Sequence, residues 1–283
     1  GLTYSSGITG VGEIAEAYKK LGILTIESNA VSRWGKLENH IERLIELPLV
    51  NQPGERFTYS VGYDVASRII EVASGTSFDA YLTKEVLLPL GMVDTFFKVP
   101  EEKQDRLARL YSPLKRTYQI PSTPKMYQEA RILPKGVKNF GVQSELVGGG
   151  NGLISSPLDY SRFLNFLLKR SEKNPLALTQ KSFDLLLNDQ LGETLGKDLM
   201  IETMGKAASN TVFSLALGIV LEKGAVAIAP ENYDYLTWGG AFSTQFWLDP
   251  KTGVSGIFMT QMFPVRARLT AELEDIADKF LTD

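Results

Sequence analysis

The stretch that decides the fold is LPLVNQPGERFTYSVGYDVASRIIEVASGTSFDAYLTKEVLLPLGMVDT, which runs from Leu47 to Thr95. Within it, YSVGYDVASRIIEVASG repeats apolar residues at helical spacing and places Gly75 where a helix commonly ends. TSFDAYLTKEVLLPLGM follows, with Ser77 at the N-cap position and Pro89-Leu90-Gly91 as the stop signal. The stretch therefore predicts two consecutive helices with defined ends.

Further helices are predicted on either side of this stretch. In KLENHIERLIEL, four apolar residues share one face: Leu37, Ile41, Leu44 and Ile45. The single histidine, His40, lies beside that face, which is typical of a residue at the boundary of the core and not of a catalyst. In SSPLDYSRFLNFLLKR, Ser156 is expected to cap a helix, with Pro157 at the first helical position and Asp159 at N3.

After Thr211 the sequence changes to strand patterns. TVFSLALGIVLEK, YDYLTWGG, STQFWLD and VSGIFMTQMF are β-branched or aromatic and bounded by turns, and RARLTAELEDIADKFLTD predicts a final helix. Helices followed by an antiparallel meander indicate an α+β protein. We expect a mainly helical part over residues 1–205, with a long irregular cover at about 99–147, and strands with the C-terminal helix over 206–283.

Composition excludes several classes of function. The net charge is −3 and basic residues form no block, so nucleic acid is not an expected partner. There is no cysteine and one histidine, which excludes disulfides and leaves no expected metal site; no cofactor is expected either. No apolar run approaches the roughly 18 residues of a membrane span. The first residues carry no signal-peptide pattern, and cytoplasmic and periplasmic locations both stay open.

Two glycine-bearing triplets compete for the role of a catalytic strand. Lys251-Thr252-Gly253 follows Asp249-Pro250 between two strand patterns, and this order is typical of a hairpin turn with glycine in a left-handed conformation. Trp238-Gly239-Gly240 lies at the end of a strand pattern, where two glycines would let a substrate approach the backbone closely. A simple bend between strands is the alternative interpretation of the second triplet.

The opening stretch, together with GGGNGLISSPLDYSRFLNFLL and the Trp-Gly-Gly strand, resembles the serine β-lactamase-like family. That family includes class C β-lactamases, D-alanyl-D-alanine carboxypeptidases and family VIII carboxylesterases. The resemblance covers nearly the whole chain. It implies a β-lactamase-like fold, in which an antiparallel sheet is flanked by helices beside a mainly helical subdomain.

Two of the three family motifs have counterparts here. Tyr59-Ser60-Val61 matches the second motif and Trp238-Gly239-Gly240 the third, which implies Tyr59 as the proton shuttle and the Ala241 N–H as an oxyanion donor. Class C β-lactamases carry asparagine and lysine where Val61 and Trp238 stand, so apolar groups replace an amide and a cation. The resemblance is therefore greatest to family VIII esterases, which act on neutral esters. It also implies that Val61, Trp238, Gly239, Gly240 and Tyr4 line the substrate site.

The first family motif, Ser-x-x-Lys, lies in the family upstream of a stretch like GLTY, with which these residues begin. Ser122-Thr123-Pro124-Lys125 follows Tyr59 in order and contains a helix-breaking proline, so it does not suit a nucleophile at the start of a helix. We therefore expect the first strands and the nucleophile helix to be missing here. A segment of the same protein, as a second polypeptide, is expected to supply them.

These residues lead to three functional hypotheses. The first is a serine carboxylesterase that hydrolyses small acyl esters through an acyl-enzyme, with this chain alone inactive. The second is a β-lactamase, D-alanyl-D-alanine carboxypeptidase or acyltransferase on the same scaffold. The third is a non-catalytic homologue that acts as a binding module.

Overall fold

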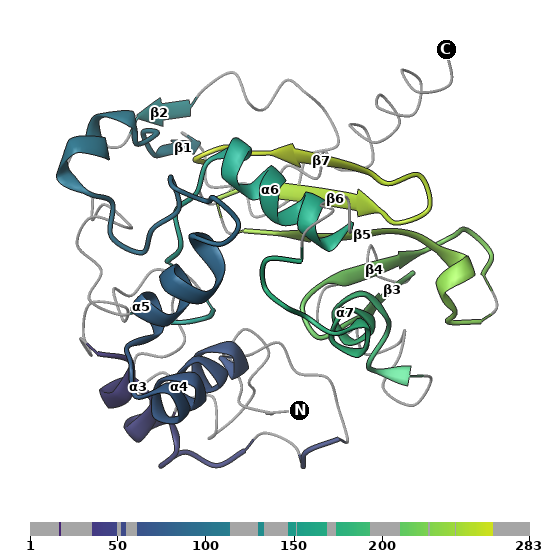
Figure 1. Ribbon diagram of the computed structural model, residues 1–283, viewed down its shortest axis with the longest axis horizontal. Coiled ribbons are helices and arrows are strands. Elements are labelled where there is room, and N and C mark those ends of the chain that lie inside the picture. The colour runs from purple at the N-terminus through teal and green to yellow at the C-terminus, as the bar shows by residue number, and fades with distance from the viewer. Residues whose placement is uncertain are drawn as a thin grey trace.

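The computed structural model describes residues 17, 36–49, 52–54, 61–113, 130–132, 147–150, 152–168, 174–192, 210–225, 227–240 and 242–262. This part of the chain combines helices with a five-stranded antiparallel sheet, which confirms the α+β class (Figure 1). The predicted final helix, RARLTAELEDIADKFLTD, lies outside the described residues. Within them, no helix is long and apolar enough to cross a membrane.

The helices of the first part are α3 (Leu37–Leu44), α4 (Gly62–Ser74) and α5 (Phe78–Leu82), the last continued by the π-helical turn η1 (Thr83–Leu87). Gly75 ends α4 with φ +70°, as predicted, and its N–H donates to the Glu71 carbonyl over 2.9 Å. Ser77 is the N-cap of α5, but its side chain makes no capping bond. The Glu71 carboxylate instead accepts the N–H of Phe78 over 3.0 Å.

Helices α3 and α4 lie against each other, and their residues Leu37, Ile41, Leu44 and Val65 form a small apolar core with Phe78 of α5. Ile45 was expected on the buried face of α3, and this was wrong: its side chain is 62% exposed. The buried face is rotated away from Ile45 toward His40, which is only 5% exposed. His40 is therefore a core residue and not the boundary residue that the sequence predicted, because α4 offers it a polar neighbour.

Further elements follow the helical part, most of them before the main sheet and the last of them between two of its strands. These are the 3₁₀ turn η2 (Glu101–Arg106), the paired strands β1 (Tyr111–Pro113) and β2 (Ala130–Ile132), α6 (Pro157–Leu167), α7 (Gln180–Leu187) and the 3₁₀ turn η5 (Pro230–Asn232). Ser156 caps α6 as predicted, and its hydroxyl accepts the N–H of Asp159 over 3.2 Å. The segment expected to be irregular thus contains a short helix and a two-stranded sheet in its described residues.

The main sheet has the order β3 (Thr211–Phe213), β4 (Gly218–Leu221), β5 (Tyr233–Gly239), β6 (Gln245–Asp249) and β7 (Val254–Phe258), each strand antiparallel to its neighbours. The pattern TVFSLALGIVLEK was expected to form one strand but forms the β3–β4 hairpin. The Ser214 hydroxyl causes the break, since it accepts the N–H groups of Ala216 and Leu217 and closes a turn. Helix α6 contacts β7 and contributes to the core over the sheet (Figure 1).

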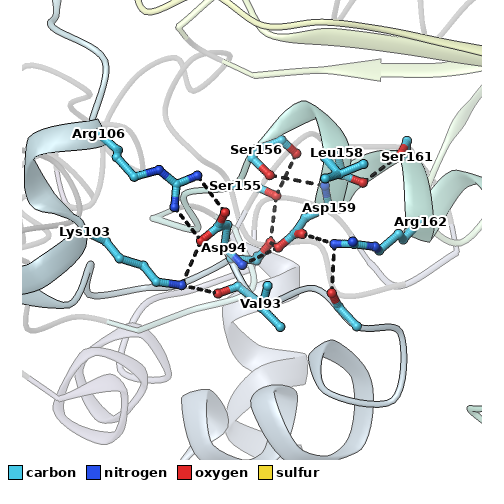
Figure 2. Close-up of polar contacts among 12 residues, drawn as sticks. Val93, Asp94, Lys103, Arg106, Ser155, Ser156, Leu158, Asp159, Ser161 and Arg162 are labelled. Atoms are coloured by element: carbon cyan, nitrogen blue, oxygen red, sulfur yellow. Dashed lines mark hydrogen bonds and ion pairs between the residues drawn. The ribbon is translucent and has the colours of Figure 1, made fainter.

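A buried carboxylate fixes the end of the GMVDT segment onto α6. Asp159, 1% exposed, accepts the Asp94 N–H over 2.6 Å and the Thr95 hydroxyl over 2.9 Å, and it pairs with Arg162 over 2.6 Å (Figure 2). The side chain of Asp94 turns outward to Lys103 and Arg106, which hold its pKa well below the ordinary value. The helical part is thereby attached to α6, the helix that packs against the main sheet.

Candidate functional site

The Lys251-Thr252-Gly253 triplet lies in the β6–β7 turn, as predicted, and not on a strand. The carboxylate of Asp249 accepts the N–H of Lys251 over 2.7 Å, and the Gly253 N–H donates to the Asp249 carbonyl over 2.8 Å. Gly253 has φ +71°, the left-handed conformation that the turn requires. The ammonium of Lys251 pairs with Glu222 at the surface. This triplet is therefore structural.

The Trp238-Gly239-Gly240 triplet ends β5, with Trp238 opposite Phe246 and Gly239 opposite Gln245. The Gly240 N–H donates to the Thr244 carbonyl over 2.8 Å and closes the β5–β6 connection. A Cβ on Gly239 would lie 3.0 Å from that carbonyl, and one on Gly240 would overlap the Thr244 hydroxyl. The tight connection itself thus requires both glycines, in addition to any use in substrate binding.

Trp238 belongs to an apolar group at this end of the sheet. Its ring packs edge-on against Phe213 with the ring centroids 4.9 Å apart, and a Cβ on Gly218 would lie 3.4 Å from the indole. The partly buried indole at this position thus packs against another aromatic ring. Such surroundings favour a neutral acyl or alcohol group over a carboxylate.

The start of α4 reaches toward the same region. Val61, the last residue of the second motif, is the N-cap of α4, and its side chain packs on the apolar core of α3 and α4. Two residues later, the Tyr63 hydroxyl donates to the Leu215 carbonyl in the β3–β4 turn over 2.6 Å. Phe213, which packs on Trp238, begins that turn. The structure thus connects the regions of the two motifs through Tyr63, Leu215 and Phe213.

Several residues named from the sequence lie outside the described residues, among them Tyr59, Ser60, Ala241, Tyr4 and Ser122. Their assigned roles stay predictions. The sequence also contains a second Ser-x-x-Lys, Ser112-Pro113-Leu114-Lys115, that was not among the predicted motifs. Ser112 and Pro113 belong to β1, where Ser112 pairs with Arg131 of β2, so this serine does not begin a helix. A nucleophile at the start of a buried helix is therefore not formed by Ser112.

A buried polar pair that was not predicted from the sequence lies beside the end of the second motif. His40 on α3 and Asp64 on α4 are 5% and 4% exposed, with Nε2 of His40 4.0 Å from Oδ2 of Asp64. Burial lowers the pKa of His40, against the effect of the Asp64 charge. Burial also raises the pKa of Asp64, against the effects of the Gly150 N–H and of His40. Neither residue belongs to a cluster with metal-binding composition, and the described residues contain no such cluster.

The sequence contains the residues that meet at this pair, but no local pattern links them. The run Gly148-Gly149-Gly150 packs on α4 against Asp64 and Ser67. An aspartate three residues after the Tyr-Ser-Val motif, a distant histidine and a glycine run have no local relation. Only the tertiary structure places them together.

Comparison with known proteins extends these observations. The family model described as Beta-lactamase matches residues 2–279. Esterase EstB of Burkholderia gladioli is 27% identical over 272 residues, covering 92% of this chain and 63% of that protein. Monacolin J acid methylbutanoyltransferase of Aspergillus terreus is 27% identical over 235 residues, covering 79% and 53%.

A solved structure shows the same fold. The hydrolase EstCE1, described as having promiscuous acyltransferase activity, superposes with a TM-score of 0.67 at 19% identity, covering 95% of this chain and 68% of that one. The present chain spans about half of the length of the methylbutanoyltransferase (53%) and less than two thirds of the length of the esterase (63%). The fold and the match over nearly the whole chain agree, and the chain belongs to the Beta-lactamase family of serine hydrolases and acyltransferases.

Proposed function

We propose that the protein containing this chain is a serine carboxylesterase of the family VIII type. The observation that carries this proposal is the apolar environment of Trp238, which packs against Phe213 at the end of β5. A lysine at this position would attract the carboxylate of a β-lactam, whereas an indole attracts the hydrocarbon part of an ester. The 27% identity to an esterase over 92% of the chain supports the same choice.

The proposed reaction proceeds in two steps through an acyl-enzyme. A serine oxygen attacks the ester carbonyl carbon, the bond to the alcohol oxygen breaks, and the alcohol leaves with the proton that the serine gave up. Water then attacks the acyl-serine and releases the carboxylic acid. The nucleophilic serine and its lysine come from a Ser-x-x-Lys segment of the same protein outside these 283 residues, either continuous with them or as a second polypeptide.

Tyr59 is assigned the transfer of the proton between serine and leaving alcohol. A free tyrosine titrates near pH 10, so a neighbouring ammonium is required to share its proton near neutral pH. Because Trp238 replaces the second cation, the lysine of Ser-x-x-Lys performs this alone. The Ala241 N–H, directly after the Trp-Gly-Gly strand, is assigned as one oxyanion donor; losing such a donor typically costs about 3 kcal/mol of transition-state stabilisation.

A second candidate function is acyl transfer to an alcohol. It is favoured by the relative named as a methylbutanoyltransferase, which is as similar to this chain as the esterase is. The two activities share the acyl-enzyme and differ only in whether water or another alcohol attacks it. An apolar site that excludes water while binding an alcohol would favour transfer.

The experiment uses the full-length protein, since the nucleophile is assigned to sequence outside these residues. Turnover of p-nitrophenyl butyrate is measured against turnover of nitrocefin, and intact mass is recorded before and after treatment with a fluorophosphonate. We expect butyrate hydrolysis to dominate and a single phosphonate adduct to appear upstream of residue 1. Added alcohol that diverts product from butyric acid to a new ester would establish acyl transfer.

Two results would contradict the proposal. Faster turnover of nitrocefin would identify a β-lactamase on this scaffold. A protein that takes up no adduct and hydrolyses neither substrate would be a non-catalytic homologue. An adduct on Ser112 or Ser122 would instead contradict the placement of the nucleophile.

A further inference from the structure

The site already described does not use the buried pair of His40 and Asp64. Both side chains are more than nine-tenths buried, on different helices, with Nε2 and Oδ2 4.0 Å apart. That separation is too long for a hydrogen bond but short enough for strong electrostatic interaction in a dry environment. Nδ1 of His40 is buried and has no hydrogen-bond partner within the described part of the chain. Buried polar groups of this kind are rarely retained without a role.

The Asp64 carboxylate joins α4 to the glycine run. Its Oδ1 accepts the N–H of Gly150 over 2.9 Å, across 86 residues of sequence. A side chain on Gly148 would overlap this carboxylate, and a Cβ on Gly149 would lie 2.6 Å from both the Tyr63 carbonyl and the Ser67 hydroxyl. The run therefore contacts the first turn of α4 through its backbone, and it can do so only because it has no side chains.

The first turn of α4 is also where the second motif ends. The Val61 carbonyl accepts the N–H groups of Asp64 over 3.0 Å and of Val65 over 3.3 Å. A displacement of Asp64 would thus displace Val61, the last residue of the second motif. Contact with His40 and Gly150 on two sides limits such a displacement.

We propose that Asp64 is a positioning residue that fixes the start of α4, where the second motif ends at Val61, by binding the Gly148–Gly150 run, with His40 supporting it from α3. This inference rests on the proposed function. Asp64 itself does not touch the substrate in this assignment. Its role is to restrict the start of α4, because a displacement of about 1 Å in a catalytic group can cost roughly a hundredfold in rate.

The geometry distinguishes Asp64 from an ordinary helix-start carboxylate. Asp79 occupies the first turn of α5 and is exposed to solvent, whereas Asp64 faces His40 and the glycine run. Among the described residues, His40 is the titratable group that acts on Asp64, and Asp64 is the one that acts on His40. The nearby charges of Arg68 and Glu38 are paired with each other.

The test compares Asp64→Ala, Asp64→Asn and the control Asp79→Asn in the full-length protein, with p-nitrophenyl butyrate as substrate. Asp64→Ala removes the acceptor for the Gly150 N–H, and we expect kcat to fall by about tenfold to a hundredfold with KM changed less than about twofold. Asp64→Asn keeps an acceptor oxygen, so it should recover most of kcat, while the acidic limb of its pH–rate profile should shift because the titrating carboxyl is gone. Asp79→Asn should match the wild type.

Amide hydrogen exchange of the peptide spanning residues 59–65 provides a second readout that does not require activity. We expect faster exchange in Asp64→Ala than in wild type and near-wild-type exchange in Asp64→Asn. If Asp64→Ala does not fold, the kcat and the pH profile of Asp64→Asn decide alone.

The outcomes separate the two proposals. An active wild type whose kcat, pH profile and exchange are unchanged by both Asp64 substitutions would overturn the positioning role and leave the esterase proposal intact. A rise in KM at constant kcat would overturn it as well, because it would place Asp64 in substrate binding. A wild type that hydrolyses no ester would overturn the esterase proposal, and the role of Asp64 with it.

Discussion

The hydroxyl of Tyr63 at the start of α4 donates a 2.6 Å hydrogen bond to the carbonyl of Leu215 in the β3–β4 turn. The two residues are 152 positions apart in the sequence. This bond connects the helix that carries the second motif to the hairpin that packs against Trp238. It therefore links the helical part to the sheet at the candidate site.

Tyr63→Phe removes this hydroxyl and little else. The bond lies at the surface, so we expect a loss of about 1 kcal/mol in the free energy of unfolding. We expect ester turnover to decrease by more than this loss of stability alone would cause, because the bond holds the β3–β4 turn near Trp238. Urea unfolding and steady-state kinetics of the full-length protein measure the two quantities, with Tyr81→Phe in α5 as the control. Equal behaviour of the two variants would mean that the bond does not matter.

Trp238→Lys restores the residue type that class C β-lactamases carry at this position. The ammonium would replace an apolar ring beside Phe213, so turnover of p-nitrophenyl butyrate should fall by about tenfold or more. Any turnover of nitrocefin should rise relative to it, because that substrate carries a carboxylate. The ratio of kcat/KM values for the two substrates is the measurement. Trp238→Phe, which keeps an apolar ring, should leave the ratio near that of the wild type.

His40 makes stability depend on pH in a defined direction. Its pKa is lowered in the folded protein from an ordinary value of 6.5, mainly by burial. As the pH falls below 6.5, the unfolded chain takes up the proton first. The contribution to stability is therefore complete above pH 6.5 and is lost on the way down to the folded pKa, by at most about 1.4 kcal/mol per pH unit. Denaturant unfolding across this range should show a flatter curve for His40→Gln.

Titration of the Asp64 carboxyl changes the free energy of unfolding in the opposite direction to that of His40 as the pH falls. Its pKa is raised above the ordinary value of 3.8, so the folded state takes up the proton first as the pH falls, and stability rises through that window. Asp64→Asn should remove this gain at low pH while keeping the His40 loss below pH 6.5. Identical pH curves for His40→Gln and the wild type would contradict the assignment to His40, and identical curves for Asp64→Asn and the wild type would contradict the assignment to Asp64. Glu42→Gln, an exposed change on α3, is the matched control.

Asp159→Ala should destabilise the fold strongly. It leaves the Asp94 N–H, the Thr95 hydroxyl and the Arg162 guanidinium without their shared carboxylate (Figure 2). Removing one partner from such a buried network costs about 3–5 kcal/mol of unfolding free energy. Asp79→Ala, at an exposed site, should cost less than about 1 kcal/mol. Chemical denaturation of the two variants decides, and similar losses would mean that the network contributes little.

Gly256→Ala should also destabilise, through overpacking. The indole of Trp247 on β6 occupies the space that a Cβ on Gly256 of β7 would need. Overpacking of a core typically costs about 1–3 kcal/mol. The double variant Gly256→Ala with Trp247→Leu provides the test, because the smaller side chain frees that space. If Trp247→Leu does not reduce the cost of Gly256→Ala in unfolding free energy, measured as the coupling between the two single variants and the double variant, overpacking is excluded as the explanation.

Several elements were predictable from the sequence because their causes are local. Gly75 ends α4, Ser156 caps α6, and Asp249 and Gly253 form the β6–β7 turn, each through bonds to residues within a few positions. These bonds depend on backbone preference and side-chain reach, which a short stretch already determines. Lys251-Thr252-Gly253 could likewise be distinguished from the strand triplet at Trp238, because the turn that contains it is closed by local bonds to Asp249.

Other features were decided only by tertiary contacts. The sequence placed Ile45 inside and His40 at the boundary, but the packing of α4 buried His40 beside Asp64 and left Ile45 exposed, since amphipathic patterns define a face only to within one residue on either side. The Ser214 turn divided an apolar run that looked continuous. The long-range bonds of Asp64 to Gly150 and of Tyr63 to Leu215 join segments with no sequence relation. The sequence by itself thus determined the helix ends, the turns and the family motifs, and the tertiary structure decided which buried groups support them.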